Sequence, residues 1–139
     1  MPPLTQWFIK SALVYLVVSL LIGVALAAQG VIALPAAVGA LMPVYVHLFM
    51  VGWITQIIFG VAYWMFPRVS KDDERGSERL ALVTYVTLNV GLIARAIVEP
   101  TLALWPAPVW TVLLIGSAVL QWLGTLAFAA NTWRRVKSR

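Results

Sequence analysis

The chain has 139 residues, of which 62% are hydrophobic and only 11% are charged, so it is far more apolar than a soluble protein. Its net charge of +5 could suit nucleic acid, but the basic residues gather at the ends of apolar runs, and we expect no nucleic-acid partner. Because there is no cysteine, disulfides, thiolate metal sites and cysteine nucleophiles are excluded. The composition predicts an integral membrane protein that lies in a lipid bilayer.

A membrane-spanning helix needs about 20 apolar residues. Four runs qualify, at about 7–28, 43–66, 80–98 and 108–132. The first carries Lys10 and Ala25-Leu26-Ala27, which imitate a secretory signal, but its apolar run is longer than a signal core, and we expect it to be retained. The apolar connection from Gly30 to Met42 has room for an interfacial helical turn. We predict an all-α, polytopic membrane four-helix bundle that forms one transmembrane domain over residues 1–139.

Basic residues indicate the orientation. With four spans, both termini and the loop between the second and third spans share one side of the membrane. That side holds every basic residue except Arg95, namely Lys10, Arg68, Lys71, Arg75, Arg79, Arg134, Arg135, Lys137 and Arg139. The positive-inside rule therefore predicts that both termini are cytoplasmic. For the RRVKSR tail, a topology anchor is favoured over a binding site for anionic lipid.

Small and weakly polar residues recur at helical spacing in the first and fourth spans. They are Ser11, Tyr15, Ser19, Gly23 and Ala27 in the first span, and Ser117, Gln121 and Thr125 beside Gly116 and Gly124 in the fourth. Such stripes let helices approach closely, so we interpret both as packing surfaces.

The second span also has a face of small and weakly polar residues. It carries the only histidine of the chain as well, away from that face. Gly52, Gln56 and Gly60 share one face at about 100° per residue, and we predict that they seat another helix, with Gln56 hydrogen-bonded to Asn89. His47 falls on nearly the opposite face. It is therefore expected to point either to lipid or to a second protomer.

The predicted orientation places His47 in the outer layer of the membrane, at the same depth as Arg95 and Glu99 of the third span. Arg95 and Glu99 either pair with each other at i, i+4 or belong to an outer-leaflet site that includes Arg95. His47 either hydrogen-bonds a carbonyl or a headgroup, or ligates a metal or cofactor. One imidazole cannot build a metal site alone, so symmetry-related copies or an axial group such as Met42 or Met50 would have to complete it.

The stretch HLFMVGWITQIIFGVAYWMFP, residues 47–67, resembles the second helix of the main subunit of haem-copper oxidases, especially in the nitric oxide reductase and cbb3-type branches. In that helix a histidine near the outer surface precedes an aromatic, glycine-bearing run that ends in a cytoplasmic proline. The matching residues are His47, Trp53, Gly60, Tyr63 and Pro67. The segment GSERLALVTYVTLNVGLIARAIVEP resembles helix three of short membrane proteins that are regarded as relatives of that subunit.

The resemblance implies that His47 is an axial ligand of haem b, with the haem propionates near Arg95. Because the family subunit consists of three four-helix units around a pseudo-threefold axis, it also implies a homo-oligomer, preferably a trimer, in a bacterial or archaeal inner membrane. The chain departs from the family by having no second histidine. Independent reduction of oxygen or nitric oxide is therefore not expected.

The sequence thus predicts a membrane protein that binds haem b, or copper or another transition metal, at an outer-leaflet site between protomers. Its expected role is binding, sensing or electron transfer. A cofactor-free scaffold or assembly factor is the main alternative. A small transporter or channel lined by Arg95, Gln56 and Asn89 is a weaker one, because paired intramembrane acids and broken helices are missing from the sequence.

Overall fold

The structure is a computed structural model that describes residues 1–67, 76–133, 135 and 136. All regular structure in these residues is helical, which confirms the predicted all-α class for this part of the chain. The elements in chain order are α1 Pro3–Ala28, α2 Ala36–Gly39, α3 Met42–His47, the π-helix η1 Leu48–Thr55, α4 Gln56–Met65, α5 Glu78–Leu104 and α6 Pro108–Trp133.

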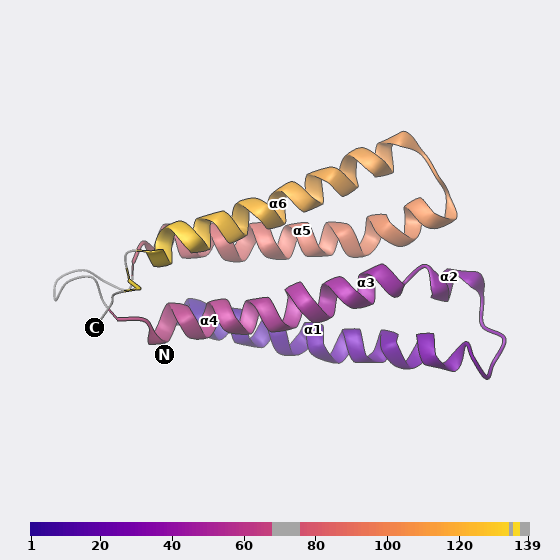
Figure 1. The fold of residues 1–139 in the computed structure, drawn as a ribbon, viewed down its shortest axis with the longest axis horizontal. Coiled ribbons are helices and arrows are strands. Elements are labelled where there is room, and N and C mark those ends of the chain that lie inside the picture. Colours follow the sequence, from indigo (N-terminus) through magenta and orange to yellow (C-terminus); the bar gives the residue numbers. More distant parts are fainter. Residues whose placement is uncertain (68–75, 134, 137–139) are drawn as a thin grey trace.

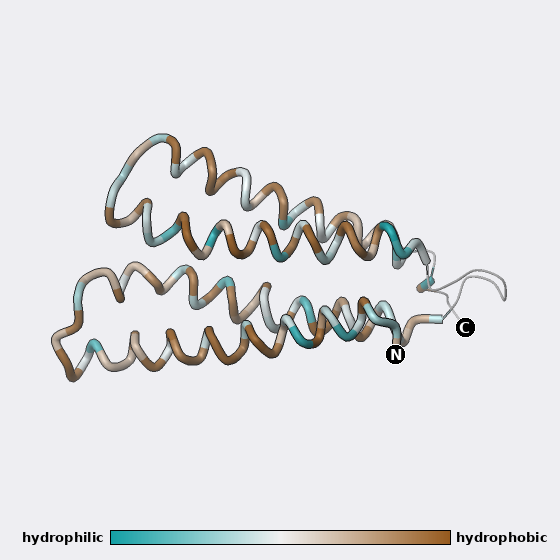
Figure 2. The backbone as a smooth tube through the Cα atoms, turned by 180° about the vertical axis from the view of Figure 1, so that it is seen from behind, coloured by the Kyte–Doolittle hydropathy of each residue, from teal (hydrophilic) through white to brown (hydrophobic). Residues whose placement is uncertain are grey.

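Four helical stretches are long and apolar enough to cross a membrane, as predicted. They are Pro3–Ala28, Ala36–Met65, Glu78–Leu104 and Pro108–Trp133. Figure 2 shows hydrophobic residues along the full length of all four. On α1, Val14, Val17, Leu21 and Val24 are 61–69% exposed, which suits contact with lipid and would be unfavourable in water.

The helices form two antiparallel hairpins that lie side by side (Figure 1). In one hairpin α1 packs along α3, η1 and α4, and in the other α5 packs along α6. The two hairpins meet mainly where α3 and η1 contact α5. Polar residues on α3 and α5 can therefore meet between the hairpins.

The buried core is divided along the length of the molecule. One cluster, at the end where α1 begins, contains Leu4, Phe8, Phe59, Tyr63, Ala81 and Leu88. The other, toward the far end, contains Val44, Leu48 and Leu92. Phe59 of α4 stacks on Phe128 of α6 with ring centroids 3.7 Å apart, which joins the two hairpins at the first cluster.

The third span is longer than predicted, because α5 runs to Leu104 although Pro100 lies inside it. Proline lacks an N–H group and usually ends or kinks a helix. In lipid, however, leaving the helix would expose further backbone groups without water to bind them. The Thr101 hydroxyl donates to the carbonyl of Ile97 at 2.6 Å, which adds a hydrogen bond across the turn that contains the proline. Glu99 therefore lies on a continuous helix, one turn after Arg95.

Most of the charges behind the predicted orientation lie outside the described residues. These are Arg68, Lys71, Arg75, Arg134, Lys137 and Arg139, together with the first part of the loop KDDERGSE. Within the described residues, α1 begins and α6 ends at the same end of the molecule, as an even number of spans requires (Figure 1). The cytoplasmic placement of that end stays a prediction.

Candidate functional site

The π-helix η1 changes the face on which His47 lies. In a uniform α-helix, His47 and Gly52 would be separated by about 140°. A π-helix has i to i+5 hydrogen bonds and more residues per turn, so five residues exceed one full turn by much less than they do in an α-helix. The Thr55 hydroxyl follows the same spacing and donates to the Met50 carbonyl at 2.9 Å. His47 is thereby brought toward the side of the helix that carries Gly52.

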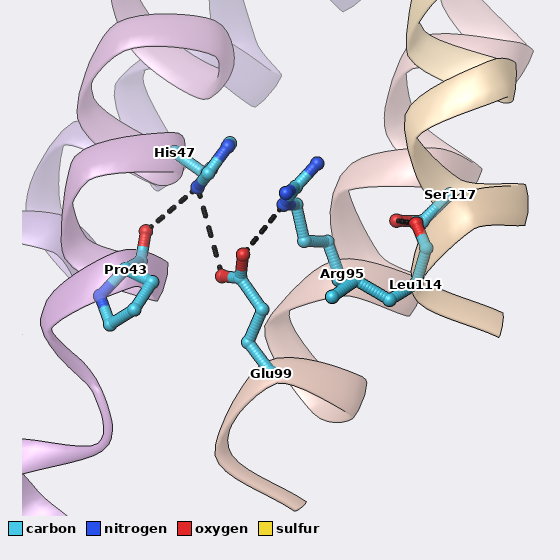
Figure 3. A network of polar contacts seen from close by, with 6 residues as sticks. All are labelled: Pro43, His47, Arg95, Glu99, Leu114 and Ser117. Atoms are coloured by element: carbon cyan, nitrogen blue, oxygen red, sulfur yellow. Dashed lines mark hydrogen bonds and ion pairs between the residues drawn. The ribbon is translucent and has the colours of Figure 1, made fainter. Parts of the chain in front are cut away.

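The prediction that His47 faces away from its own helices is therefore wrong. Its Nδ1 lies 3.7 Å from Glu99 Oε2 on α5 of the same chain (Figure 3). The same nitrogen lies 2.9 Å from the carbonyl oxygen of Pro43, one turn earlier on α3. A carbonyl can only accept, so Nδ1 is the protonated nitrogen that donates. The carbonyl hydrogen bond, one of the alternatives left open for His47, is thus present within the chain's own bundle.

Arg95 and Glu99 form the i, i+4 pair that was one of the two predicted alternatives. Arg95 Nε donates to Glu99 Oε1 at 2.7 Å. The Glu99 side chain is 9% exposed and that of Arg95 19%, so the pair is held largely inside protein. Glu99 Oε2 is buried and accepts no hydrogen bond from any described residue, although His47 Nδ1 lies nearby. A carboxylate that is bonded on one side only is an uncommon and costly arrangement in a span.

The arrangement leaves Nε2 of His47 open. Within the described part of the chain, Nε2 makes no hydrogen bond, and the imidazole is 28% exposed. Ligating histidines are commonly oriented by a hydrogen bond from their other ring nitrogen to a backbone carbonyl or a carboxylate. His47 has the carbonyl in contact and the carboxylate just beyond hydrogen-bond distance, so its geometry suits a ligand that binds through Nε2.

A metal ion bound by side chains of this chain alone does not fit as well. Among residues 1–67, 76–133, 135 and 136, no three His, Cys, Asp or Glu side chains come together in a way that could hold a metal ion. Haem has four ring nitrogens of its own and needs one or two axial protein ligands. Haem would thus need only this one imidazole from the described residues, whereas a bare copper or zinc ion would need further ligands.

The predicted packing residues of the second span lie at contacts between helices. A Cβ atom on Gly52 would lie 2.8 Å from Tyr15 Cβ, and one on Gly60 would lie 2.8 Å from Phe8 Cβ, so both glycines let α1 approach. Gln56 is fully buried, and its amide exchanges hydrogen bonds of 3.3 and 3.4 Å with Asn89.

Two residues of the small-residue stripe of the first span also form hydrogen bonds between the hairpins. The Tyr15 hydroxyl donates to Asn89 Oδ1 at 2.8 Å, and Ser11 Oγ lies 2.7 Å from the hydroxyl of Tyr85. Tyr85 was not predicted to take part, because its partner is on a helix distant in sequence. In the fourth span, Gly124 would bring a Cβ atom within 2.6 Å of Thr87 Oγ1, which confirms close packing of α5 and α6.

Arg135 is a structural residue that no sequence pattern distinguished from its neighbours in the RRVKSR tail. It is fully buried, and its guanidinium donates to the carbonyls of Tyr63, Phe66 and Pro67 at 2.6–3.2 Å. The C-terminal carbonyls of a helix lack intrahelical partners and favour a nearby cation. Arg135 therefore caps the end of α4 from the end of α6.

Comparisons of the chain with protein-family models, with curated proteins and with solved structures find no match.

Proposed function

We propose that this chain is an integral membrane protein that binds haem b through Nε2 of His47 and acts in binding, sensing or electron transfer. The observation that supports it is the hydrogen bond from His47 Nδ1 to the Pro43 carbonyl. A hydrogen bond of this kind commonly orients the ring of a histidine that binds a ligand through its other nitrogen. Haem, when bound, supplies reversible one-electron chemistry. The chain's own residues supply an oriented donor nitrogen between α3 and α5.

Arg95 has a second role in this proposal. Its Nε is used by Glu99, whereas its terminal guanidinium nitrogens make no hydrogen bond within the described part of the chain. Figure 3 shows these nitrogens and the free side of the His47 ring pointing into the same space between the hairpins. A guanidinium there would stabilise an acidic group of the ligand, such as a haem propionate.

The site proposed here belongs to one protomer, because His47 faces α5 of its own chain. We retain a homotrimer of such units, cytoplasmic termini and a bacterial or archaeal inner membrane as parts of the proposal. Copper or another transition metal is less favoured, since it would need ligands beyond His47. Neighbouring copies would have to provide them.

Haem titration of the purified, haem-free protein tests the proposal. The wild-type protein is expected to bind about one haem per chain and to show a Soret band distinct from that of haem in detergent alone. His47→Ala should weaken binding by at least about ten-fold, because the axial ligand is lost. Added imidazole should restore the spectrum. The matched control Met65→Leu removes an exposed thioether at the end of α4, away from His47, and should bind haem as the wild-type protein does.

Equal haem binding by wild-type protein and His47→Ala, without any effect of imidazole, would contradict the proposal. Absence of haem binding by the wild-type protein would also contradict it, and would favour the second candidate, a scaffold or assembly factor without cofactor. That candidate is supported by the mutual contacts of His47, Arg95 and Glu99, since these polar side chains partly stabilise one another without any ligand.

A further inference from the structure

A groove lies between the first turns of α1 and α5, at the end of the molecule where α1 begins. It has a volume of about 270 Å³ and is lined by Pro3, Leu4, Trp7, Glu78, Arg79 and Leu82. Both helices are long enough to cross a membrane, and in a bilayer the groove faces lipid. Its residues lie within about 6 Å of the helix starts, which corresponds to the level where headgroups meet acyl chains.

The floor and the rim of this groove differ in character. Leu4, Trp7 and Leu82 form an apolar floor, and the Trp7 ring is 50% exposed, as is common for tryptophan at a membrane interface. Arg79 lies at the rim, is exposed, and makes no ion pair or hydrogen bond with any described residue. A guanidinium at this level binds phosphate with two parallel hydrogen bonds.

Glu78 lies next to Arg79 in the sequence and also lines the groove, so its negative charge repels an anion bound there. Its carboxylate lies in the first turn of α5, where it is also stabilised by the positive end of the helix. Ser77 caps the same turn by accepting a hydrogen bond from the backbone N–H of Leu80 at 3.3 Å. Glu78 therefore weakens, but does not replace, the attraction of Arg79 for a phosphate group.

We propose that this groove binds an anionic phospholipid, with an acyl chain against Leu4, Trp7 and Leu82 and the headgroup phosphate on Arg79. The exposed Lys10, three residues after Trp7 on α1, can extend toward the same headgroup layer. The site does not depend on haem binding or on His47. Its test is therefore independent of the proposed function.

Lipid retention can be measured by native mass spectrometry after the protein is incubated with equal amounts of phosphatidylglycerol and phosphatidylcholine with the same acyl chains. Wild-type protein should retain phosphatidylglycerol preferentially. Arg79→Gln should reduce that preference about five-fold, the effect expected for one basic side chain at an anionic surface. Glu78→Gln should increase it. Leu82→Trp, which fills the groove, should lower retention of both lipids, whereas Leu113→Trp on the exposed side of α6 should not.

Three results would overturn the proposal. One is equal retention of the two lipids by the wild-type protein, and another is an unchanged preference in Arg79→Gln. The third is competition by soluble glycerol phosphate as effective as that by the lipid, because the site would then recognise free phosphate. Unchanged helix content by circular dichroism and a single oligomer size establish that each variant is folded.

Discussion

Replacing Glu99 with alanine is expected to lower the free energy of unfolding by about 3 kcal/mol, because Arg95 would keep its charge inside the bundle without a counter-ion. The Glu99 side chain is 9% exposed, and its Oε1 accepts the 2.7 Å hydrogen bond from Arg95. Because the pair is held largely inside protein, little water can reach Arg95 to replace that bond. Equilibrium unfolding in mixed micelles, followed by circular dichroism, measures the loss.

The control for this prediction is a double-mutant cycle. The cycle comprises Glu99→Ala, Arg95→Met and the double variant with both substitutions, in which both charges are removed together and stability should return to within about 1 kcal/mol of the wild-type value. If Glu99→Ala alone were as stable as the wild-type protein, the pair would not be buried in the membrane. If the two single effects simply added, the ion pair would contribute nothing.

The second large effect is expected at Gly52, where a side chain would separate α1 from η1. Its Cβ atom would lie 2.8 Å from Tyr15 Cβ and 3.0 Å from Leu92 Cδ2, so a larger residue must push the backbones apart. Gly52→Leu should therefore cost about 3 kcal/mol or more, as overpacking in a tight contact does. The same unfolding measurement applies.

Gly116 on α6 is the matched control, because a Cβ atom there would have no neighbour within 4 Å. Gly116→Leu should change stability by less than about 0.5 kcal/mol or increase it slightly, since leucine favours a helix more than glycine does. Similar losses at both glycines would show that the destabilisation comes from removing a glycine in a helix and not from helix contact.

Hydropathy predicted the four spans because the bilayer requires long apolar runs, whatever the details of packing. Contacts within one helix or between regular faces were predictable too. Arg95 and Glu99 are one turn apart on the same helix. The hydrogen bond between Gln56 and Asn89 was predictable because two polar residues at the middle of adjacent spans need hydrogen-bond partners.

The surroundings of His47 were not predictable from helical periodicity. Helical periodicity uses a constant rotation per residue, and this rotation changes in the π-helix η1, which begins directly after the histidine. The end of α5 was misplaced for a related reason, since Pro100 usually stops a helix but does not stop this one. Arg135 also lacked a signal, because its partners are carbonyls about 70 residues away in the chain.

In the proposed function, the hydrogen bond from Nδ1 to the Pro43 carbonyl holds the His47 ring, and Nε2 is offered to a ligand. Because the chain has a single histidine, protein labelled with ¹⁵N only in histidine gives one pair of ring nitrogen resonances. Without ligand, Nδ1 should carry the hydrogen-bonded proton and Nε2 should carry none. Addition of haem should strongly shift or broaden Nε2, while Nδ1 keeps its proton. A proton on Nε2 with bare Nδ1, or resonances that haem leaves unchanged in folded protein, would contradict the claim.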